Sequence, residues 1–180
     1  MEIKSGAKKK IDKPMAKIPS KYFCFVNALI PIMIVEAFFR KFGEGSFKQL
    51  YVGSGNKLLK NKYFMGMIRN LDAVNRTKPL IKFIPRYPVA TFLAEETDVV
   101  LAHQWGNPLN YSYLDAIHFG YPVVHNAEFI KDAGYYYKDF EIYDGMKQLD
   151  VAINQHDNNI DDVYLLIPLL PTCNIQTNIE

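Results

Sequence analysis

The chain has 180 residues, of which 21 are basic and 19 acidic, giving a formal net charge of +2. This length accommodates one domain with a sizeable hydrophobic core, and the near balance of charge excludes an argument from net charge for bulk nucleic-acid binding. Cys24 and Cys173 follow neither the spacing of a metal site nor that of a disulfide framework. We therefore expect no metal centre and a reducing, cytoplasmic location.

Basic residues are concentrated at the start of the chain. The lysines among the first 21 residues are Lys4, Lys8, Lys9, Lys10, Lys13, Lys17 and Lys21. This pattern predicts a flexible basic arm over residues 1–20. The simpler interpretation of such an arm is a solubilising tail, and the alternative is contact with a phosphate-rich polymer or a membrane.

The next segment is apolar. Tyr22–Val26 is expected to form a short strand and Ala28–Lys41 a buried helix that Gly43 ends. The run Phe23–Phe39 could instead be interpreted as a membrane anchor, but it is marginally short for that purpose and contains Pro31. We therefore predict no membrane span.

Strand and helix patterns then alternate along the chain. The expected strands are Phe47–Val52, Leu80–Ile84, Val99–Ala102 and Tyr121–Val124. The expected helical segments are Lys57–Arg76, Tyr87–Glu95 and Tyr143–His156. This alternation predicts an α/β fold, a Rossmann-like, mainly parallel sheet of about five strands with helices on both faces. The predicted domain spans residues 21–157, and residues 158–180 are expected to form an irregular tail.

A polar turn follows the apolar strand Val99–Ala102, with the sequence HQWGNP over residues 103–108. Ligands of open α/β sheets gather at the carboxyl ends of strands, and unpaired amides at a helix N-terminus attract anions. The turn and the helix after it therefore predict a phosphate site. That helix could begin after Asn107, with Pro108 in its first turn, or at Tyr111 with Asn110 as its cap.

The later start gives the helix a defined polar face. From Tyr111, the spacing puts Asp115 and His118 on one side of the helix. The residues expected to face the sheet are Tyr113, Ala116, Ile117 and Gly120, with Gly120 also ending the helix. Asp115 would lie roughly 7 Å along the axis, within reach of a sugar hydroxyl.

Each of these residues also has a purely structural interpretation. The asparagines could be ordinary helix caps, and Asp115 could simply face water. The histidines His103, His118 and His125 could be hydrogen-bonded packing residues. Arg86, after the strand Leu80–Ile84, could grip a diphosphate from beside the polar turn, or it could pair on the surface with Glu95 or Glu96.

Five positions around the predicted helix follow a known spacing: Asn107, Asp115, Ala116, Gly120 and Pro122. They resemble the donor-binding half of GT-B glycosyltransferases, whose retaining members often carry an acid, seven intervening residues, a second acid, then Ala, Gly and Pro before a strand. More closely, the segments HQWGNPLNYSYLDAIHFGYPVVHN, KDAGYYY and DF are similar to a poorly characterised bacterial and phage family regarded as glycosyltransferase-like. The resemblance covers roughly residues 22–157.

The resemblance implies one half of a GT-B fold and a nucleotide-diphosphate sugar as the donor substrate, with no further cofactor. The acceptor side would come from a second domain, a second chain or another copy of this chain, and a glycan and modified DNA are both worth testing as acceptors. The residues expected to bind the nucleotide sugar are Arg86, His103, Gln104, Trp105, Asn107, Asn110, Tyr111, Asp115, His125 and Asn126. No catalytic residue is assigned.

One departure from the GT-B pattern supports an alternative function. Asn107 stands in place of the first acid, so a non-catalytic nucleotide- or glycan-binding module, or a truncated inactive glycosyltransferase, is the main alternative to an active enzyme. A nicotinamide enzyme is disfavoured because no Gly-x-Gly-x-x-Gly turn follows a predicted strand.

Overall fold

The computed structural model describes residues 20–24, 28–106 and 110–163 of the chain. Residues 1–19 of the predicted basic arm and residues 164–180 of the predicted tail lie outside the described residues. The strands are β1 (Ser20–Cys24), β2 (Phe47–Val52), β3 (Ile81–Phe83), β4 (Val99–Leu101), β5 (Val123–His125) and β6 (Tyr135–Tyr136). The α-helices are α2 (Leu29–Phe42), α3 (Lys62–Ile68), α4 (Val89–Glu96), α5 (Tyr111–His118) and α6 (Ile142–Val163), and two 3₁₀ segments are η1 (Gly55–Lys60) and η2 (Glu128–Ile130).

The strands form one sheet in the order β3-β2-β1-β4-β5-β6, and every neighbouring pair is parallel. This is the strand order of a doubly wound Rossmann-like fold, so the predicted fold class is confirmed. The order reverses between β1 and β4, and in such sheets ligands bind in the crevice outside the carboxyl ends of the strands at that reversal. The fold therefore directs attention to the residues that follow β4.

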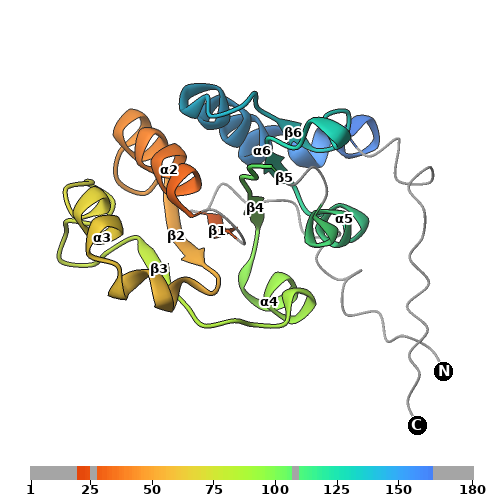
Figure 1. Cartoon of the computed structure of the whole chain (residues 1–180). Coiled ribbons are helices and arrows are strands. Elements are labelled where there is room, and N and C mark those ends of the chain that lie inside the picture. Colours follow the sequence, from red (N-terminus) through yellow and green to blue (C-terminus); the bar gives the residue numbers. More distant parts are fainter. Residues whose placement is uncertain (1–19, 25–27, 107–109, 164–180) are drawn as a thin grey trace, which may run out of the picture.

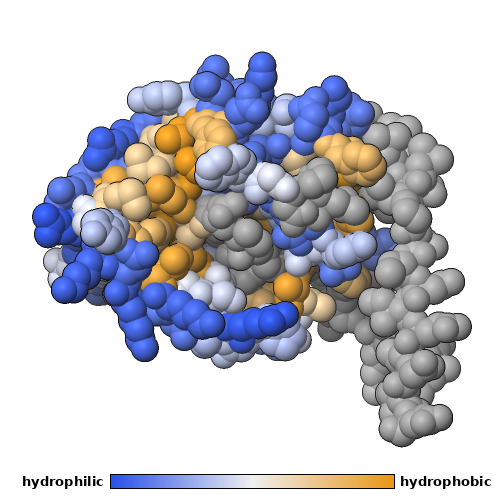
Figure 2. All heavy atoms as spheres, viewed as in Figure 1, coloured by the Kyte–Doolittle hydropathy of each residue, from blue (hydrophilic) through white to orange (hydrophobic). Residues whose placement is uncertain are grey.

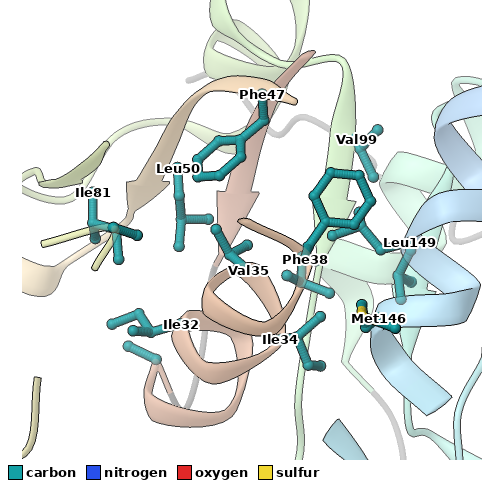
Figure 3. Close-up of a cluster of buried hydrophobic side chains, with 14 of the residues drawn as sticks. Ile32, Ile34, Val35, Phe38, Phe47, Leu50, Ile81, Val99, Met146 and Leu149 are labelled. Carbon is teal, nitrogen blue, oxygen red and sulfur yellow. The ribbon is translucent and has the colours of Figure 1, made fainter. Parts of the chain in front are cut away.

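Helices cover both faces of the sheet, as expected. Along β4 the side chains alternate between two hydrophobic clusters, with Val99 and Leu101 in the first and Val100 and Ala102 in the second. The first cluster contains residues of α2 and α6, which lie side by side above the sheet in Figure 1. Figure 3 shows this cluster, in which Phe38 of α2 and Leu149 of α6 approach Val99. The second cluster lies under α4 and α5.

Hydrophilic and hydrophobic residues occupy different parts of the face shown in Figure 2. Figure 2 shows hydrophilic residues along most of the margin of the molecule and hydrophobic ones gathered inward, around α2. None of the helices in the described part of the chain combines the length and the hydrophobicity that a bilayer crossing requires.

Several element bounds agree closely with the sequence expectations, and β2 has the predicted bounds. The predicted number of strands, about five, is lower than the six observed. The additional strand is β6, which consists of only two residues and is defined by its pairing with β5. Gly134 permits that pairing: its φ is +82°, and a Cβ at this position would lie 2.7 Å from the carbonyl oxygen of Val123.

Two helical predictions also need correction. The helical region predicted to reach Arg76 ends at Ile68. In the turn that follows, the amides of Asp72 and Ala73 donate to the buried carboxylate of Glu36 in α2 and not to carbonyl groups of a continuing helix. The closing helix continues to Val163, past the predicted domain end at residue 157.

Candidate functional site

Three neighbouring parallel strands, β4, β5 and β6, end at the same edge of the sheet. The register pairs Leu101 with Val124, and His125 with Tyr136. The residues that follow these strand ends are His103, Gln104 and Trp105 after β4, Asn126 after β5, and Tyr137 to Phe140 after β6. The candidate site is built from these strand ends and the N-terminus of α5.

Asn126 holds the three strand ends together. Its Oδ1 accepts from the Gln104 amide at 2.7 Å, and its Nδ2 donates to the carbonyl oxygens of Gln104 (2.8 Å) and Asp139 (3.2 Å). The prediction that Asn126 binds the nucleotide sugar therefore needs correction, because both ends of its amide are already hydrogen-bonded to the backbone. Its contribution to the site is to fix the turn that presents His103, Gln104 and Trp105.

His103 is buried beneath this turn, with 1% of its surface exposed. Its Nδ1 lies 3.0 Å from the hydroxyl of Tyr137, and that hydroxyl donates to the carbonyl oxygen of Ala102 at 3.0 Å. The ring of Phe140 lies 4.7 Å away on a tilted contact. Burial lowers the pKa of His103, so the imidazole is neutral at neutral pH. Its Nε2 is buried and has no hydrogen-bond partner among the described residues.

Gln104 and Trp105 complete the turn. Gln104 is 7% exposed, and neither its Oε1 nor its Nε2 has a hydrogen-bond partner in the described part of the chain. Trp105 is 79% exposed and makes an edge-to-face contact with Phe140 at 5.9 Å. Buried polar groups in proteins are almost always hydrogen-bonded. Two consecutive residues with unpartnered buried groups, beneath an exposed indole, therefore mark a place where a polar ligand can bind.

The helix after the turn begins at Tyr111, which confirms the later of the two predicted starts. Asn110 caps it, with Oδ1 accepting from the Ser112 amide at 2.9 Å, and the Tyr113 amide bonds to the carbonyl oxygen of Asn110. Asn110 is thus the helix cap, as one of the two sequence interpretations had it, and its contact with a ligand stays a prediction. The Ser112 and Tyr113 amides are therefore paired at the helix start, so fewer amides of the first turn remain for the predicted phosphate site.

The faces of α5 are those predicted from its sequence. Tyr113, Ala116 and Ile117 are buried, whereas Tyr111, Asp115 and His118 are exposed. Gly120, with φ +73°, follows the last turn. Tyr111 and Asp115 are therefore available to a ligand at this edge of the sheet. Asn107, the first position of the GT-B pattern, lies outside the described residues.

Replacement of Asn110 by alanine should cost about 1 kcal/mol of stability, because the Ser112 amide loses its side-chain acceptor. Urea denaturation of the variant and of the wild type measures this difference. The matched control is Asn154→Ala, which removes an exposed asparagine whose side chain bonds only to Asp150, four residues earlier in α6, and should cost less. Equal stability of Asn110→Ala and the wild type would contradict the capping role.

His125 cannot contact a ligand as predicted. The side chain is completely buried, its Nε2 donates to the carbonyl oxygen of Ala133 at 2.6 Å, and its Nδ1 accepts from the Ala127 amide at 3.2 Å. Burial lowers its pKa to about 4. His125 therefore fixes the loop between β5 and β6, which is the packing interpretation that the sequence left open.

Arg86 lies in the connection between β3 and α4. β3 is at one edge of the sheet, and β2 and β1 separate it from β4. Neighbouring strands are spaced by about 4.8 Å, so the ends of β3 and β4 are roughly 14 Å apart. The two strands are therefore not neighbours in the sheet, and a contact of Arg86 with a diphosphate stays a prediction.

Two residues that shape the site were missed. Tyr137 sets the hydrogen bonding of His103, and Phe140 packs between His103 and Trp105. Both lie in the segments KDAGYYY and DF, whose residues were not among those expected to bind the nucleotide sugar. A signal was available, because three tyrosines after a glycine suggest a short aromatic strand.

Comparison with known proteins gives one family and a set of similar folds. A family described as "Protein of unknown function (DUF2827)" matches residues 20–165. No curated protein gives a match. Among solved structures, the C-terminal domain of the Glycosyl Transferase Group 1 family protein LpcC from Francisella tularensis has 16% sequence identity and a TM-score of 0.56, and the match covers 94% of this chain and 92% of that one.

Two larger glycosyltransferases of the GT-B class are also similar. A mutant of S. aureus TarM, in complex with fondaparinux, alpha-GlcNAc-glycerol and UDP, has 14% identity and a TM-score of 0.53, with 81% of this chain and 33% of that chain covered. The catalytic domain of starch synthase IV from Arabidopsis thaliana, bound to ADP and acarbose, has 12% identity and a TM-score of 0.52, with coverages of 88% and 38%. The chain thus spans about a third of these two proteins, and it has the Rossmann-like fold of one GT-B domain.

Proposed function

The chain belongs to the DUF2827 family of proteins of unknown function, and from its fold and candidate site we propose that it is the donor-binding half of a glycosyltransferase. In this proposal a sugar is transferred from a nucleotide-diphosphate sugar to an acceptor such as a glycan or modified DNA. One observation carries it: the buried polar groups of His103 and Gln104 lack partners among the described residues, at the end of the strand beside which the sheet order reverses.

Each part of the site has a role in this proposal. The N-terminus of α5 and the Tyr111 amide would face the diphosphate, where the helix dipole favours negative charge. Asp115 would accept hydrogen bonds from the ribose. His103, Gln104 and Trp105 would face the sugar, together with Asn107. Because transfer places negative charge on the departing diphosphate, donors already in position at the helix N-terminus would contribute most in the transition state.

The fold likeness supports this proposal. TarM is described in complex with UDP, and the starch synthase domain is described as bound to ADP and acarbose. In this chain the corresponding ligand would be a nucleoside diphosphate carrying a sugar. The acceptor side would come from a further domain, a partner chain or a second copy, because one such domain supplies only one wall of a GT-B cleft.

Calorimetric titration of the full chain with UDP-glucose, GDP-glucose, ADP-glucose and the three bare diphosphates tests the proposal. Binding of at least one diphosphate sugar is expected. If none of the diphosphate sugars binds, the glycosyltransferase proposal is overturned, and binding of NAD in their place would indicate a nicotinamide enzyme. Uncharged Asn107, in place of the acid, favours a second candidate, a binding module. A binding module would bind a diphosphate sugar but would neither hydrolyse it nor transfer its sugar.

Replacement of Asp115 by asparagine should weaken binding of the bare nucleoside diphosphate by about tenfold, because hydrogen bonds to a carboxylate contribute more than those to a neutral amide. The control is Asp132→Asn, which removes an exposed acid before β6 without touching α5. Calorimetry with the diphosphate that binds the wild type measures both variants. A similar change in the two variants would assign the effect to net charge and would contradict a ribose contact.

A further inference from the structure

The hydrogen bonds around His103 define which of its nitrogens can serve a ligand. Tyr137 has a single hydroxyl proton, and it donates this proton to the carbonyl oxygen of Ala102, which can only accept. Its contact with His103 at 3.0 Å must then be a donation from the Nδ1–H of the imidazole. In a neutral imidazole this tautomer leaves a lone pair on Nε2. The unpartnered Nε2 of His103 is therefore a hydrogen-bond acceptor.

A second tyrosine–histidine pair in the same molecule shows the contrast. The hydroxyl of Tyr135 lies 3.0 Å from Nδ1 of His156, and the other ring nitrogen of His156 lies 3.1 Å from the carbonyl oxygen of Gly120. Both nitrogens of His156 are therefore paired within the protein. His103 has the same tyrosine contact but leaves one nitrogen without a partner among the described residues.

Gln104 supplies an independent observation of the same kind. Its main-chain amide and carbonyl are both held by Asn126, so the backbone is fixed while the buried side-chain amide has no partner in the described part of the chain. This amide offers one acceptor and two donor hydrogens. Together, the two residues present acceptors and donors without a formal charge. Such a set suits hydroxyl groups, which can both donate and accept, whereas the Nε2 lone pair would repel the oxygens of a phosphate or a carboxylate.

The surroundings of His103 fit a sugar. Phe140 is about half exposed and lies between the imidazole and the indole of Trp105, which is itself mostly exposed. Nε2 of His103 is buried, so a ligand can reach it only where a neighbouring side chain moves, and Phe140 is the ring in direct contact with the imidazole. The exposed indole of Trp105 offers a flat apolar surface on which the face of a sugar ring could pack.

We propose that His103 and Gln104 select the sugar of the donor, with Nε2 of His103 accepting a hydrogen bond from a sugar hydroxyl, and that Tyr137 is a positioning residue that holds the acceptor tautomer. This inference rests on the proposed function and specifies its sugar contact. It predicts that the sugar part of the donor contributes to affinity through a hydroxyl that meets an uncharged acceptor.

The test measures the ratio between the affinity for a diphosphate sugar and that for its bare diphosphate, using whichever of UDP-glucose, GDP-glucose and ADP-glucose binds. Tyr137→Phe should lower this ratio by about fivefold, the worth of one neutral hydrogen bond, and leave the affinity for the bare diphosphate unchanged. Tyr135→Phe is the matched control, because it also removes a buried tyrosine hydroxyl from a histidine Nδ1, and its ratio should equal that of the wild type.

A measurement on the wild type covers the case in which Tyr137→Phe does not fold. The ¹⁵N resonance of His103 Nε2 should show an unprotonated nitrogen in the free protein and should shift when the diphosphate sugar is added but not with the bare diphosphate. A protonated Nε2, or the same shift with both ligands, overturns the inference while donor binding leaves the proposed function intact. If none of UDP-glucose, GDP-glucose and ADP-glucose binds, both this inference and the proposed function are overturned.

Discussion

The free energy of unfolding should fall by about 3 kcal/mol as the pH drops from 7 to 4, through the protonation of His125 alone. This imidazole is buried, and burial lowers its pKa from 6.5 to about 4. In the unfolded chain the same group takes up a proton near its ordinary value. The unfolded state therefore binds more protons, and stability present above pH 6.5 is lost as the pH falls through the folded pKa.

Two further histidines also make the folded state less stable in acid. Burial lowers the pKa of His103 and that of His156, so both also resist protonation in the folded state. The carboxyl of Glu128 has its pKa lowered by its hydrogen bonds with Tyr136 and Lys131, which extends the same trend to lower pH. Acid should therefore destabilise the protein through its buried histidines before most carboxylates are protonated.

Urea denaturation at a series of pH values between 7.5 and 4.5 measures this effect. The matched control is His118→Gln, which removes an exposed imidazole from α5, so the difference between this variant and His125→Phe isolates the effect of burial. His125→Phe should flatten the dependence, whatever its stability at pH 7, because the titrating group is gone. A wild-type stability that stays constant between pH 6.5 and 4.5 would contradict the burial of neutral histidines.

Local sequence patterns were sufficient for the elements that local interactions determine. The cap and the faces of α5 could be predicted because Asn110 and the helical spacing act within eight residues of chain. The bounds of β2 could be predicted because turn residues, Gly45-Ser46 before it and Gly53-Ser54 after it, enclose a segment that begins with Phe47 and ends with Leu50-Tyr51-Val52. In both cases the information lies in the segment itself.

The sheet neighbours of β3 and the pairing partner of β6 could not be predicted in this way. Arg86 was expected beside the turn after β4 because the two segments are close in sequence, whereas the sheet order puts β2 and β1 between β3 and β4. The two residues of β6 form a strand only because β5 is there to pair with them. Strand order and pairing are properties of the whole sheet.

The candidate site shows a second kind of limit. His103, His125 and Asn126 are the polar residues that a ligand site requires, and their types alone do not tell a ligand contact from an internal one. The distinction depends on partners far along the chain, such as Tyr137 for His103 and Ala133 for His125. His103 remains a candidate because only one of its nitrogens finds such a partner among the described residues, whereas both nitrogens of His125 do.

Replacement of Glu36 by alanine should destabilise the protein by about 3 kcal/mol, because it removes acceptors from buried amides. Glu36 lies in the apolar helix α2 and is 3% exposed. Its two carboxylate oxygens accept from the amides of Asp72 and Ala73, each at 2.9 Å, and from Nε of Arg40 at 2.7 Å. These bonds explain why a charged residue stands in a segment whose composition otherwise suggested a membrane anchor.

The cost arises mainly at the Ala73 amide, because Ala73 is completely buried and water cannot replace the lost carboxylate. Glu36→Gln keeps one carbonyl oxygen as an acceptor and should be less destabilising than Glu36→Ala. Glu95→Ala, which removes an exposed glutamate from α4, is the control for the loss of a helical glutamate and should change stability by no more than about 0.5 kcal/mol. Thermal and urea denaturation of the three variants should therefore rank them Glu36→Ala, Glu36→Gln and Glu95→Ala in decreasing loss. If Glu36→Ala were as stable as Glu95→Ala, the carboxylate would not hold the turn after α3.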